Sequence, residues 1–319
     1  MDRRSFLQSI GAAALSPRLQ PRVGPSPGPG SSAPAGGRKA VLISLLPGGA
    51  PSASDAPAAT GRVQTVLSYL DRFALARDAG FDAVEMQTIS RNEEAAEIRE
   101  ASEKTGLRIH SVMNADHWRF PLSSGDRDVV NRSVAGMDTS LRNAALWGAD
   151  TVLLVPAVVD PTTSYRDAWT RSQEVIRRRL LPLAQELKVI IAVEEVWNKF
   201  LLSPLEVARY VDEFDSPWLK AYFDVGNVVF YGYRQDWIRT LAARIVKVHL
   251  KDFQLDRPNG RFTWRNIGDG DIDWLAVHRA FADIGYRGYV TTEVAPGDAA
   301  YLKDLANRVD RFLAGQKPV

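Results

Sequence analysis

Short apolar runs alternate along the chain with longer amphipathic stretches, and several of the amphipathic stretches end in glycine. Apolar runs rich in Val, Ile and Leu are typical of strands that are buried on both faces of a parallel sheet. Amphipathic stretches closed by glycine are typical of helices. The pattern predicts eight strands, at residues 39–46, 81–86, 107–113, 150–155, 189–195, 219–224, 245–250 and 289–293.

Helices are predicted between and after these strands, at residues 66–79, 93–105, 126–147, 165–187, 204–214, 237–243, 273–284 and 299–313. This α/β alternation of eight units over about 280 residues predicts a (β/α)8 TIM barrel, which typically has ~250 residues. A doubly wound open sheet is the rival. It would need a glycine-rich phosphate-binding turn after the first strand, and LLPGGAPSAS does not match G-x-G-x-x-G.

Composition narrows the chemistry that the barrel can perform. The chain has no cysteine, which excludes disulfides, thiolate nucleophiles and thiolate metal sites. It has only four histidines, so a metal site would depend mainly on carboxylates. The net charge is +2, and without residues 1–38 the chain retains 35 basic and 37 acidic residues. With no basic tract, nucleic acid is not an expected partner.

Residues 1–38 are predicted to be a leader and linker that precede the catalytic domain at 39–319. The opening MDRRSFLQSIGAAALS has paired arginines followed by a short apolar run, and it resembles a twin-arginine export signal. The following PRLQPRVGPSPGPGSSAPAGG has the Pro, Gly and Ser content of a linker. We therefore expect the twin-arginine export machinery as a partner and a periplasmic location. A chance arginine pair would instead leave the protein in the cytoplasm.

Four strands end abruptly in polar side chains, and these ends carry the functional prediction. Glu195, Asp224, His249 and Glu293 end the fifth to eighth strands. All strand C-termini ring one mouth of a barrel, so these residues are expected to converge there. Three carboxylates and an imidazole suit Mn²⁺, Mg²⁺ or Co²⁺ better than a structural Zn²⁺. A single acid at a strand end is more often a cap or a solvated residue, but four on consecutive strands favour a shared site.

The motifs EVWNKF, FDVGN, VHLKD and TTEV, with GDGDIDW before the last, resemble the xylose-isomerase-like TIM barrels. The resemblance covers roughly residues 39–315 and is to the sugar (or sugar phosphate) isomerase/epimerase family. It implies metal ligands at Glu195, Asp224, His249 and Glu293. It also implies Mn²⁺ as the metal, with Mg²⁺, Co²⁺ or Zn²⁺ as alternatives. Glu195 is preferred to Glu194 because E-V-x-N-[KR]-F aligns in that way. Several 3-epimerases have histidine where this chain has Asn227, and D-x-G-N looks more like the ketose-phosphate epimerase branch.

The implied reaction is removal of a proton next to a sugar carbonyl through an enediolate, with Glu195 and Glu293 as the acid–base pair. Return of the proton to the same carbon gives epimerisation, and return to the neighbouring carbon gives isomerisation. Loss of a β-hydroxyl would instead make the enzyme a dehydratase or lyase, for example of inososes or 3-keto-glycosides. A sugar-binding barrel without catalysis is a third alternative. The sequence leaves open the sugar, its phosphorylation and the oligomeric state, including a homo-oligomer.

Further polar and aromatic residues near strand ends are candidates for contact with a small sugar or keto-sugar substrate. Each also has an ordinary structural interpretation, such as a loop hydrogen bond, a packed imidazole or an ion pair with a ligand carboxylate. Trp264 and Arg265 lie in the insertion before GDGD and could form a lid. The candidates are Glu85, His110, His117, Trp118, Asn227, Lys251 and Arg265.

Overall fold

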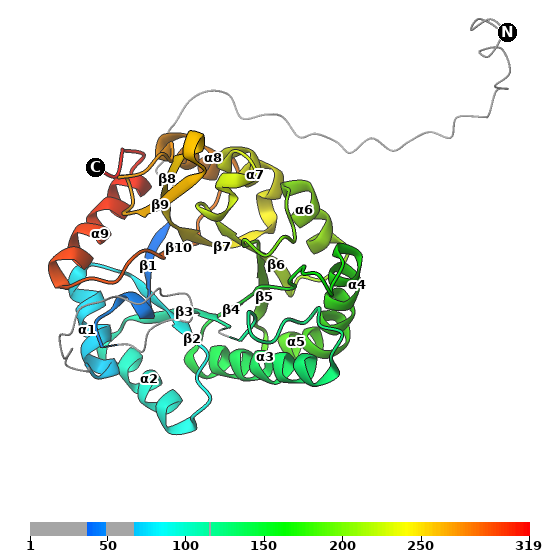
Figure 1. Ribbon diagram of the computed structural model, residues 1–319. Coiled ribbons are helices and arrows are strands. Elements are labelled where there is room, and N and C mark those ends of the chain that lie inside the picture. The colour runs from blue at the N-terminus through cyan, green and yellow to red at the C-terminus, as the bar shows by residue number, and fades with distance from the viewer. Residues whose placement is uncertain (1–36, 49–66, 115) are drawn as a thin grey trace, which may run out of the picture. The chain divides into compact units, whose positions relative to one another are not determined.

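The computed structural model describes residues 37–48, 67–114 and 116–319. Eight strands close into a barrel in the order β1-β10-β7-β6-β5-β4-β3-β2 (Figure 1). All eight neighbouring pairs are parallel, which confirms the predicted (β/α)8 TIM barrel. The strands are β1 (Arg38–Leu42), β2 (Ala83–Gln87), β3 (Arg108–Met113), β4 (Thr151–Leu154), β5 (Ile190–Glu194), β6 (Leu219–Asp224), β7 (Ile245–Leu250) and β10 (Tyr289–Thr292).

A ring of helices surrounds the barrel, as Figure 1 shows. Two helices end at glycine, as predicted. Gly80 and Gly106 cap their helices with φ of 101° and 70°, a left-handed conformation that favours glycine. The α-helices are α1 (Tyr69–Ala79), α2 (Asn92–Thr105), α3 (Arg127–Trp147), α4 (Tyr165–Val175), α5 (Leu181–Leu187), α6 (Pro204–Asp212), α7 (Arg234–Leu241), α8 (Trp274–Asp283) and α9 (Ala299–Leu313). Short 3₁₀ turns are η1 (Ile43–Leu45), η3 (Asn227–Phe230), η4 (Ala242–Arg244) and η5 (Arg257–Asn259).

The helix predicted over residues 165–187 is interrupted. A π-helical turn, η2 (Ile176–Leu180), separates α4 from α5. Pro182 lies in the first turn of α5 and has no backbone N–H to donate to the carbonyl of Arg178. The lost donor accounts for the shift in the hydrogen-bond ladder at this point.

Apolar side chains form one layer between the strands and helices and a smaller one inside the barrel. On β5, Ile191 and Val193 belong to the outer layer, whereas Ala192 belongs to the inner cluster with Tyr222 of β6. Successive strand residues point to opposite faces, so the alternation on β5 fixes which of its terminal residues face the barrel interior.

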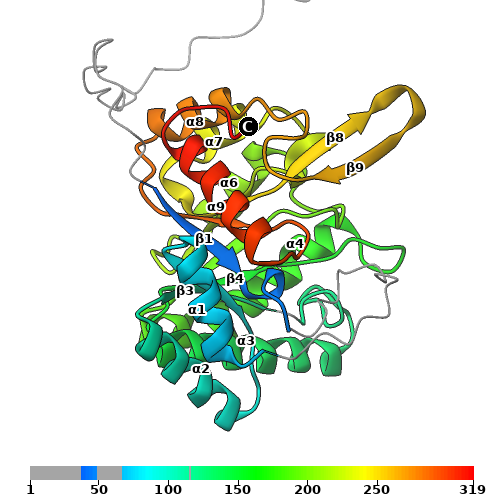
Figure 2. The ribbon, with the colours of Figure 1, turned by 90° about the vertical axis from the view of Figure 1, so that its left-hand side faces the viewer.

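The insertion predicted as a long connection contains a β-hairpin of strands β8 (Asp252–Asp256) and β9 (Arg261–Arg265). In Figure 2 the hairpin projects beyond the body of the barrel. Asp252 fixes its base: Oδ2 accepts hydrogen bonds from the backbone N–H of Gly268 (2.8 Å) and Gly270 (3.1 Å) and from Trp274 Nε1 (2.9 Å). A Cβ at Gly270 would lie 2.2 Å from Asp252 Oδ1, so the GDGD segment needs glycine there.

The predicted export signal and most of the linker, residues 1–36, lie outside the described residues. The described chain enters β1 at Arg38, one residue before the predicted domain boundary. Among the described residues, no helix combines the length and apolar character needed to cross a bilayer.

Candidate metal and active site

Three carboxylates and one imidazole meet inside the mouth of the barrel. Glu194, Asp224, His249 and Glu293 each offer one ligand atom, and these atoms all lie within 4.8 Å of one another. They come from the ends of the consecutive neighbours β5, β6, β7 and β10. We call these four residues the acidic group. The predicted convergence of four strand ends is therefore present in the fold.

The structure differs from the sequence prediction at one of the four positions, because Glu194 and not Glu195 joins the group. Glu194 shares the face of Ala192 and is in register with Tyr222, and both of these residues point into the barrel. Glu195 follows the last residue of β5 and is not a member of the group. In the structure the carboxylate that β5 contributes to the group is thus that of Glu194, and the assignment of Glu195 as ligand stays a prediction.

Glu195 is nevertheless buried, with an exposed fraction of 1%, and neither of its carboxylate oxygens has a hydrogen-bond partner in the described chain. Burial raises the pKa of Glu195 well above its usual value, and the charges of Glu194 and Asp224 raise it further. The surroundings of Glu195 therefore favour its protonated form.

The FDVGN segment holds Asp224 by a local turn. Asp224 Oδ1 accepts hydrogen bonds from the backbone N–H of Gly226 (2.7 Å) and Asn227 (2.9 Å), which leaves Oδ2 facing the acidic group. Gly226 is required because a Cβ there would lie 2.7 Å from Cβ of Lys251. The Asn227 side chain donates from Nδ2 to the carbonyl oxygen of Glu195 (3.0 Å), so it ties the ends of β5 and β6 together.

His249 has a different partner on each ring nitrogen. Nδ1 lies 3.0 Å from Glu194 Oε1, 2.9 Å from Glu293 Oε2 and 3.9 Å from Asp224 Oδ2. Nε2 lies 3.1 Å from Oε2 of Glu85, which also accepts a hydrogen bond from Tyr222. Nδ1 is thus the nitrogen directed to the acidic group, while Nε2 pairs with Glu85 on the other side of the ring.

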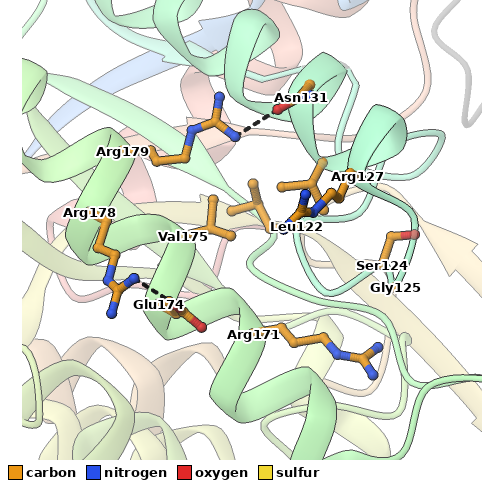
Figure 3. Close-up of a pocket in the computed structure, with 11 residues that line it drawn as sticks. Leu122, Ser124, Gly125, Arg127, Asn131, Arg171, Glu174, Val175, Arg178 and Arg179 are labelled. Atoms are coloured by element: carbon orange, nitrogen blue, oxygen red, sulfur yellow. Dashed lines mark hydrogen bonds and ion pairs between the residues drawn. The ribbon is translucent and has the colours of Figure 1, made fainter.

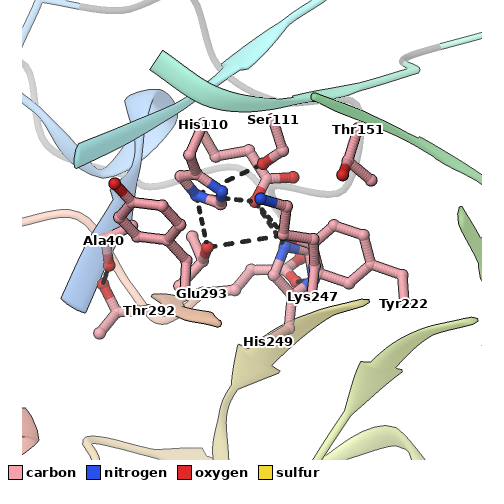
Figure 4. A network of polar contacts seen from close by, with 12 residues as sticks. Ala40, His110, Ser111, Thr151, Tyr222, Lys247, His249, Thr292 and Glu293 are labelled. Carbon is pink, nitrogen blue, oxygen red and sulfur yellow. Dashed lines mark hydrogen bonds and ion pairs between the residues drawn. The ribbon is translucent and has the colours of Figure 1, made fainter. Parts of the chain in front are cut away.

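Deeper in the barrel, a fully buried polar network supports His249 (Figure 4). His110 Nε2 lies 3.0 Å from Thr291 Oγ1, and its ring stacks on Tyr289 at 4.5 Å between centroids. Burial lowers the pKa of His110 well below its usual value, and nearby Lys247 and His249 add to the effect. Glu85 and His110, predicted as substrate contacts, are therefore packed beneath the acidic group.

Lys251 places an ammonium group against two of the carboxylates. Its Nζ lies 3.0 Å from Asp224 Oδ2 and 3.0 Å from Glu293 Oε2. Burial works against the Glu293 carboxylate, but Lys251 and His249 outweigh it and lower the pKa of Glu293. For Glu194, burial dominates over the same two cations and raises the pKa to about 7. The pKa values of these two carboxylates at the mouth are thus shifted in opposite directions.

The chemistry of the acidic group fits a divalent cation. Oxygen ligands with one imidazole are the set preferred by Mn²⁺ and related hard cations. Asp224 Oδ2 is buried and accepts no well-directed hydrogen bond, although Lys251 is close. Glu85 on His249 Nε2 is the kind of outer carboxylate that orients a metal-binding histidine.

The remaining predicted contacts lie at the rim. His117 is buried and its Nδ1 has no hydrogen-bond partner in the described chain. Burial lowers the pKa of His117 to about 4, opposed in part by Glu293. Trp118 packs beside His117 with centroids 5.5 Å apart and is 48% exposed. Arg265 is on the polar face of the hairpin, where its guanidinium donates to Gln254 Oε1.

Sequence reasoning missed Glu194, Tyr222 and an aromatic cluster around the hairpin. The signal for the hairpin was present: residues 252–256 and 261–265 alternate polar and apolar positions and flank the four residues 257–260, which end in Asn259-Gly260. Asn-Gly between alternating segments is a strong hairpin signature, and Gly260 has a φ of 60°.

A cavity of about 640 Å³ lies between α3 and α4 and shares no residue with the acidic group (Figure 3). Three of its four arginines have protein partners at the wall: Arg178 lies 3.0 Å from Glu174, Arg179 donates to Asn131 (2.8 Å) and Arg171 donates to the carbonyl oxygen of Ser123 (3.3 Å). The cavity is therefore a feature of the outer wall, separate from the candidate active site.

The family model for the xylose isomerase-like TIM barrel matches residues 73–310. The chain belongs to this family. It is 30% identical over 242 residues to the Escherichia coli K12 protein named "Putative L-ribulose-5-phosphate 3-epimerase SgbU", which covers 72% of this chain and 84% of the relative. It is 28% identical to L-ribulose-5-phosphate 3-epimerase UlaE of Escherichia coli O1:K1, over 69% of this chain and 80% of the relative.

Solved structures share the family's barrel. An L-ribulose 3-epimerase aligns with a TM-score of 0.69 at 19% identity, over 87% of this chain and 94% of that one. The 3-keto-D-glucoside 4-epimerase YcjR of E. coli aligns with a TM-score of 0.63 at 16% identity, over 77% and 95%. At these identities the likeness shows the fold alone.

Proposed function

We propose that this chain is a divalent-metal-dependent sugar epimerase or isomerase that removes a proton next to a carbonyl group. The observation that carries the proposal is the convergence of Glu194, Asp224, His249 and Glu293 at the mouth of the barrel. Membership of a family with epimerase relatives supports the same class of reaction.

Glu194, Asp224, His249 and Glu293 would hold the cation, for which we propose Mn²⁺ because the donors are mainly oxygen. When bound, such a cation supplies positive charge that polarises a sugar carbonyl. The chain's own residues manage the proton. Glu293, kept ionised by Lys251, is placed to take a proton, and Glu194 is the second carboxylate through which one can return. The Lys251 ammonium also offers positive charge to a developing oxyanion.

The test is exchange of the substrate's α-proton with solvent. Protein supplied with Mn²⁺ would be incubated in D₂O with L-ribulose, its 5-phosphate and other ketoses, and deuterium incorporation followed by NMR. We expect metal-dependent exchange that is lost in Glu293→Gln. Product analysis separates epimerisation, isomerisation and elimination, since each follows the same first step. Undiminished exchange after complete metal removal, or in Glu293→Gln, would refute the proposal.

We also propose that residues 1–38 direct twin-arginine export, so that the barrel works in the periplasm. The support is the opening Arg3-Arg4-Ser-Phe-Leu, followed by a short apolar run. Replacing Arg3 and Arg4 by lysine should retain the protein in the cytoplasm, as measured by cell fractionation. Equal periplasmic amounts of both forms would contradict this route.

A further inference from the structure

The hairpin β8–β9 has one polar and one apolar face. Its register pairs Phe253 with Trp264 and Leu255 with Phe262, and these four side chains share one face. The other face is polar, with Asp252, Gln254 and Asp256 opposite Arg265, Thr263 and Arg261. An amphipathic hairpin is expected to turn its apolar face toward the protein.

That apolar face packs on aromatic residues that follow β5 and β6, the strands that deliver Glu194 and Asp224. Trp197 stacks on Trp264 with centroids 5.2 Å apart and an interplanar angle of 16°. Phe230 lies 6.0 Å from Phe262. We call Trp197, Phe230, Phe253, Phe262 and Trp264 the aromatic wall. Phe253 is its buried base, whereas Phe230, Phe262 and Trp264 are 47%, 44% and 46% exposed.

Lys251 joins the aromatic wall to the acidic group. Its Nζ lies 3.0 Å from both Asp224 and Glu293 and 5.7 Å from the ring centroid of Trp264. The side chain of Trp197 is tied to the same place, because its Nε1 donates to the carbonyl oxygen of Asn227 (2.9 Å). A sugar ring held at the acidic group would thus lie beside the wall. A second ring joined to that sugar could then contact the wall.

The wall is fixed in position. Asp252, at the start of the hairpin, is fully buried and accepts hydrogen bonds from three groups of the GDGD segment and α8. An exposed aromatic surface on a rigid support is typical of ligand-binding sites, and aromatic rings contribute large apolar contact areas.

We propose that the aromatic wall binds a second ring joined to the reacting sugar, so that the enzyme acts on a glycoside carrying a keto group. The proposal rests on the proposed function and names its substrate class. A ring suits the wall better than a phosphate does, since the cation that contacts Trp264, Lys251, already faces two carboxylates and Arg265 lies on the polar face of the hairpin. The inward direction of the apolar face favours a bound ligand over a second copy of the chain.

The test compares two probes that differ only in their aglycone, methyl and phenyl β-D-glucopyranoside oxidised to the ketone at C3. Dissociation constants would be measured by calorimetry with full-length protein supplied with Mn²⁺. We expect the phenyl probe to bind at least tenfold more tightly. In Trp264→Ala and Phe262→Ala the preference should fall below threefold, and Trp264→Phe should keep most of it.

Tyr233→Ala is the matched control, because Tyr233 is an aromatic residue outside the wall that is 75% exposed. It should keep the full preference for the phenyl probe. Equal affinity for the two probes in the wild type, including no measurable binding of either, would overturn the proposal even if the wall variants fail to fold. The proposal would also be overturned if Trp264→Ala and Phe262→Ala changed the oligomeric mass of the protein but kept its preference for the phenyl probe. Proton exchange on free ketoses tests the proposed function separately, so either idea can fail alone.

Discussion

Two adjacent glutamates at the end of β5 differ in their surroundings, and this difference gives a test at the level of single residues. Glu194 contributes to the acidic group, while Glu195 lies behind it without a hydrogen-bond partner in the described chain. We expect Glu194→Gln to weaken Mn²⁺ binding by roughly 10–100-fold or more, since a ligand is lost. Glu195→Gln should change the affinity less than threefold. Calorimetric titration would measure both. The reverse order would restore the ligand assignment implied by the family resemblance.

Glu195→Gln should also stabilise the metal-free protein above mildly acidic pH. The pKa of Glu195 is raised from 4.5 in the folded chain, so the native state keeps a proton that the unfolded state releases. Stability therefore falls as pH rises above about 4.5, and glutamine removes this loss. We therefore expect the Tm of Glu195→Gln to exceed that of the wild type at pH 8. Melting curves at pH 5 and pH 8 would test it, and a gain that is larger at pH 5 would contradict it.

Metal affinity should depend on pH through Glu194. Burial raises its pKa to about 7, so below neutral pH a cation must displace a proton from this carboxyl. We expect Mn²⁺ affinity to fall about tenfold per pH unit below pH 7, and binding at pH 6 to release protons. Calorimetry in two buffers with different ionisation enthalpies measures that release. Glu194→Gln should release fewer protons, and an affinity constant from pH 6 to 8 would contradict the assignment.

The sequence could not predict which face of β5 points into the barrel, and this set the limit of the site prediction. At Asp224, His249 and Glu293 no adjacent residue is of a type that binds metals, so each strand end offered one choice. The barrel fold alone then predicted that these three residues meet. At Glu194-Glu195 both neighbours are ligand types. The choice depends on which of Ile191 or Ala192 faces the interior, and both are apolar. Only three-dimensional packing resolves that alternative.

At the level of elements, the base of the hairpin gives a stability prediction. Asp252→Ala would leave the backbone N–H groups of Gly268 and Gly270 and the Trp274 indole without their acceptor. Each unsatisfied buried donor costs about 1–3 kcal/mol, so we expect a loss of roughly 3 kcal/mol in the free energy of unfolding. Urea denaturation would measure it. Asp256→Ala, on the exposed part of the same hairpin, should cost less than about 0.5 kcal/mol. Similar losses in both variants would contradict this account.

The elements themselves were largely predictable because each strand of the barrel is an apolar run and several helices end at a glycine. The hairpin was not predicted, because Phe253, Phe262 and Trp264 lie within a polar insertion whose alternation is short. The π-helical turn before Pro182 was also missed, since a single proline near the end of a long amphipathic pattern does not change its periodicity.

At the level of the whole molecule, the acidic group gathers negative charge from several strands at one mouth of the barrel. Glu194, Asp224 and Glu293 come from three different strands, and in the described part of the chain His249 and Lys251 are in direct contact with them. A cation held there would join β5, β6, β7 and β10, which together form half of the barrel. Occupancy of the site should therefore be visible in global stability as well as in activity.

We expect addition of Mn²⁺ to chelator-treated protein to raise the Tm, because a ligand that binds only the native state stabilises it. At a free metal concentration 100 times the Kd, the gain is about 2.7 kcal/mol, or roughly 5 °C for a chain of this size. Differential scanning calorimetry over a range of Mn²⁺ concentrations would measure the shift. The Glu194→Gln, Glu293→Gln double variant serves as control and should melt at the same temperature with and without metal. A wild-type Tm that does not respond to Mn²⁺, or an equal shift in the double variant, would mean that the four strand ends do not bind the cation together.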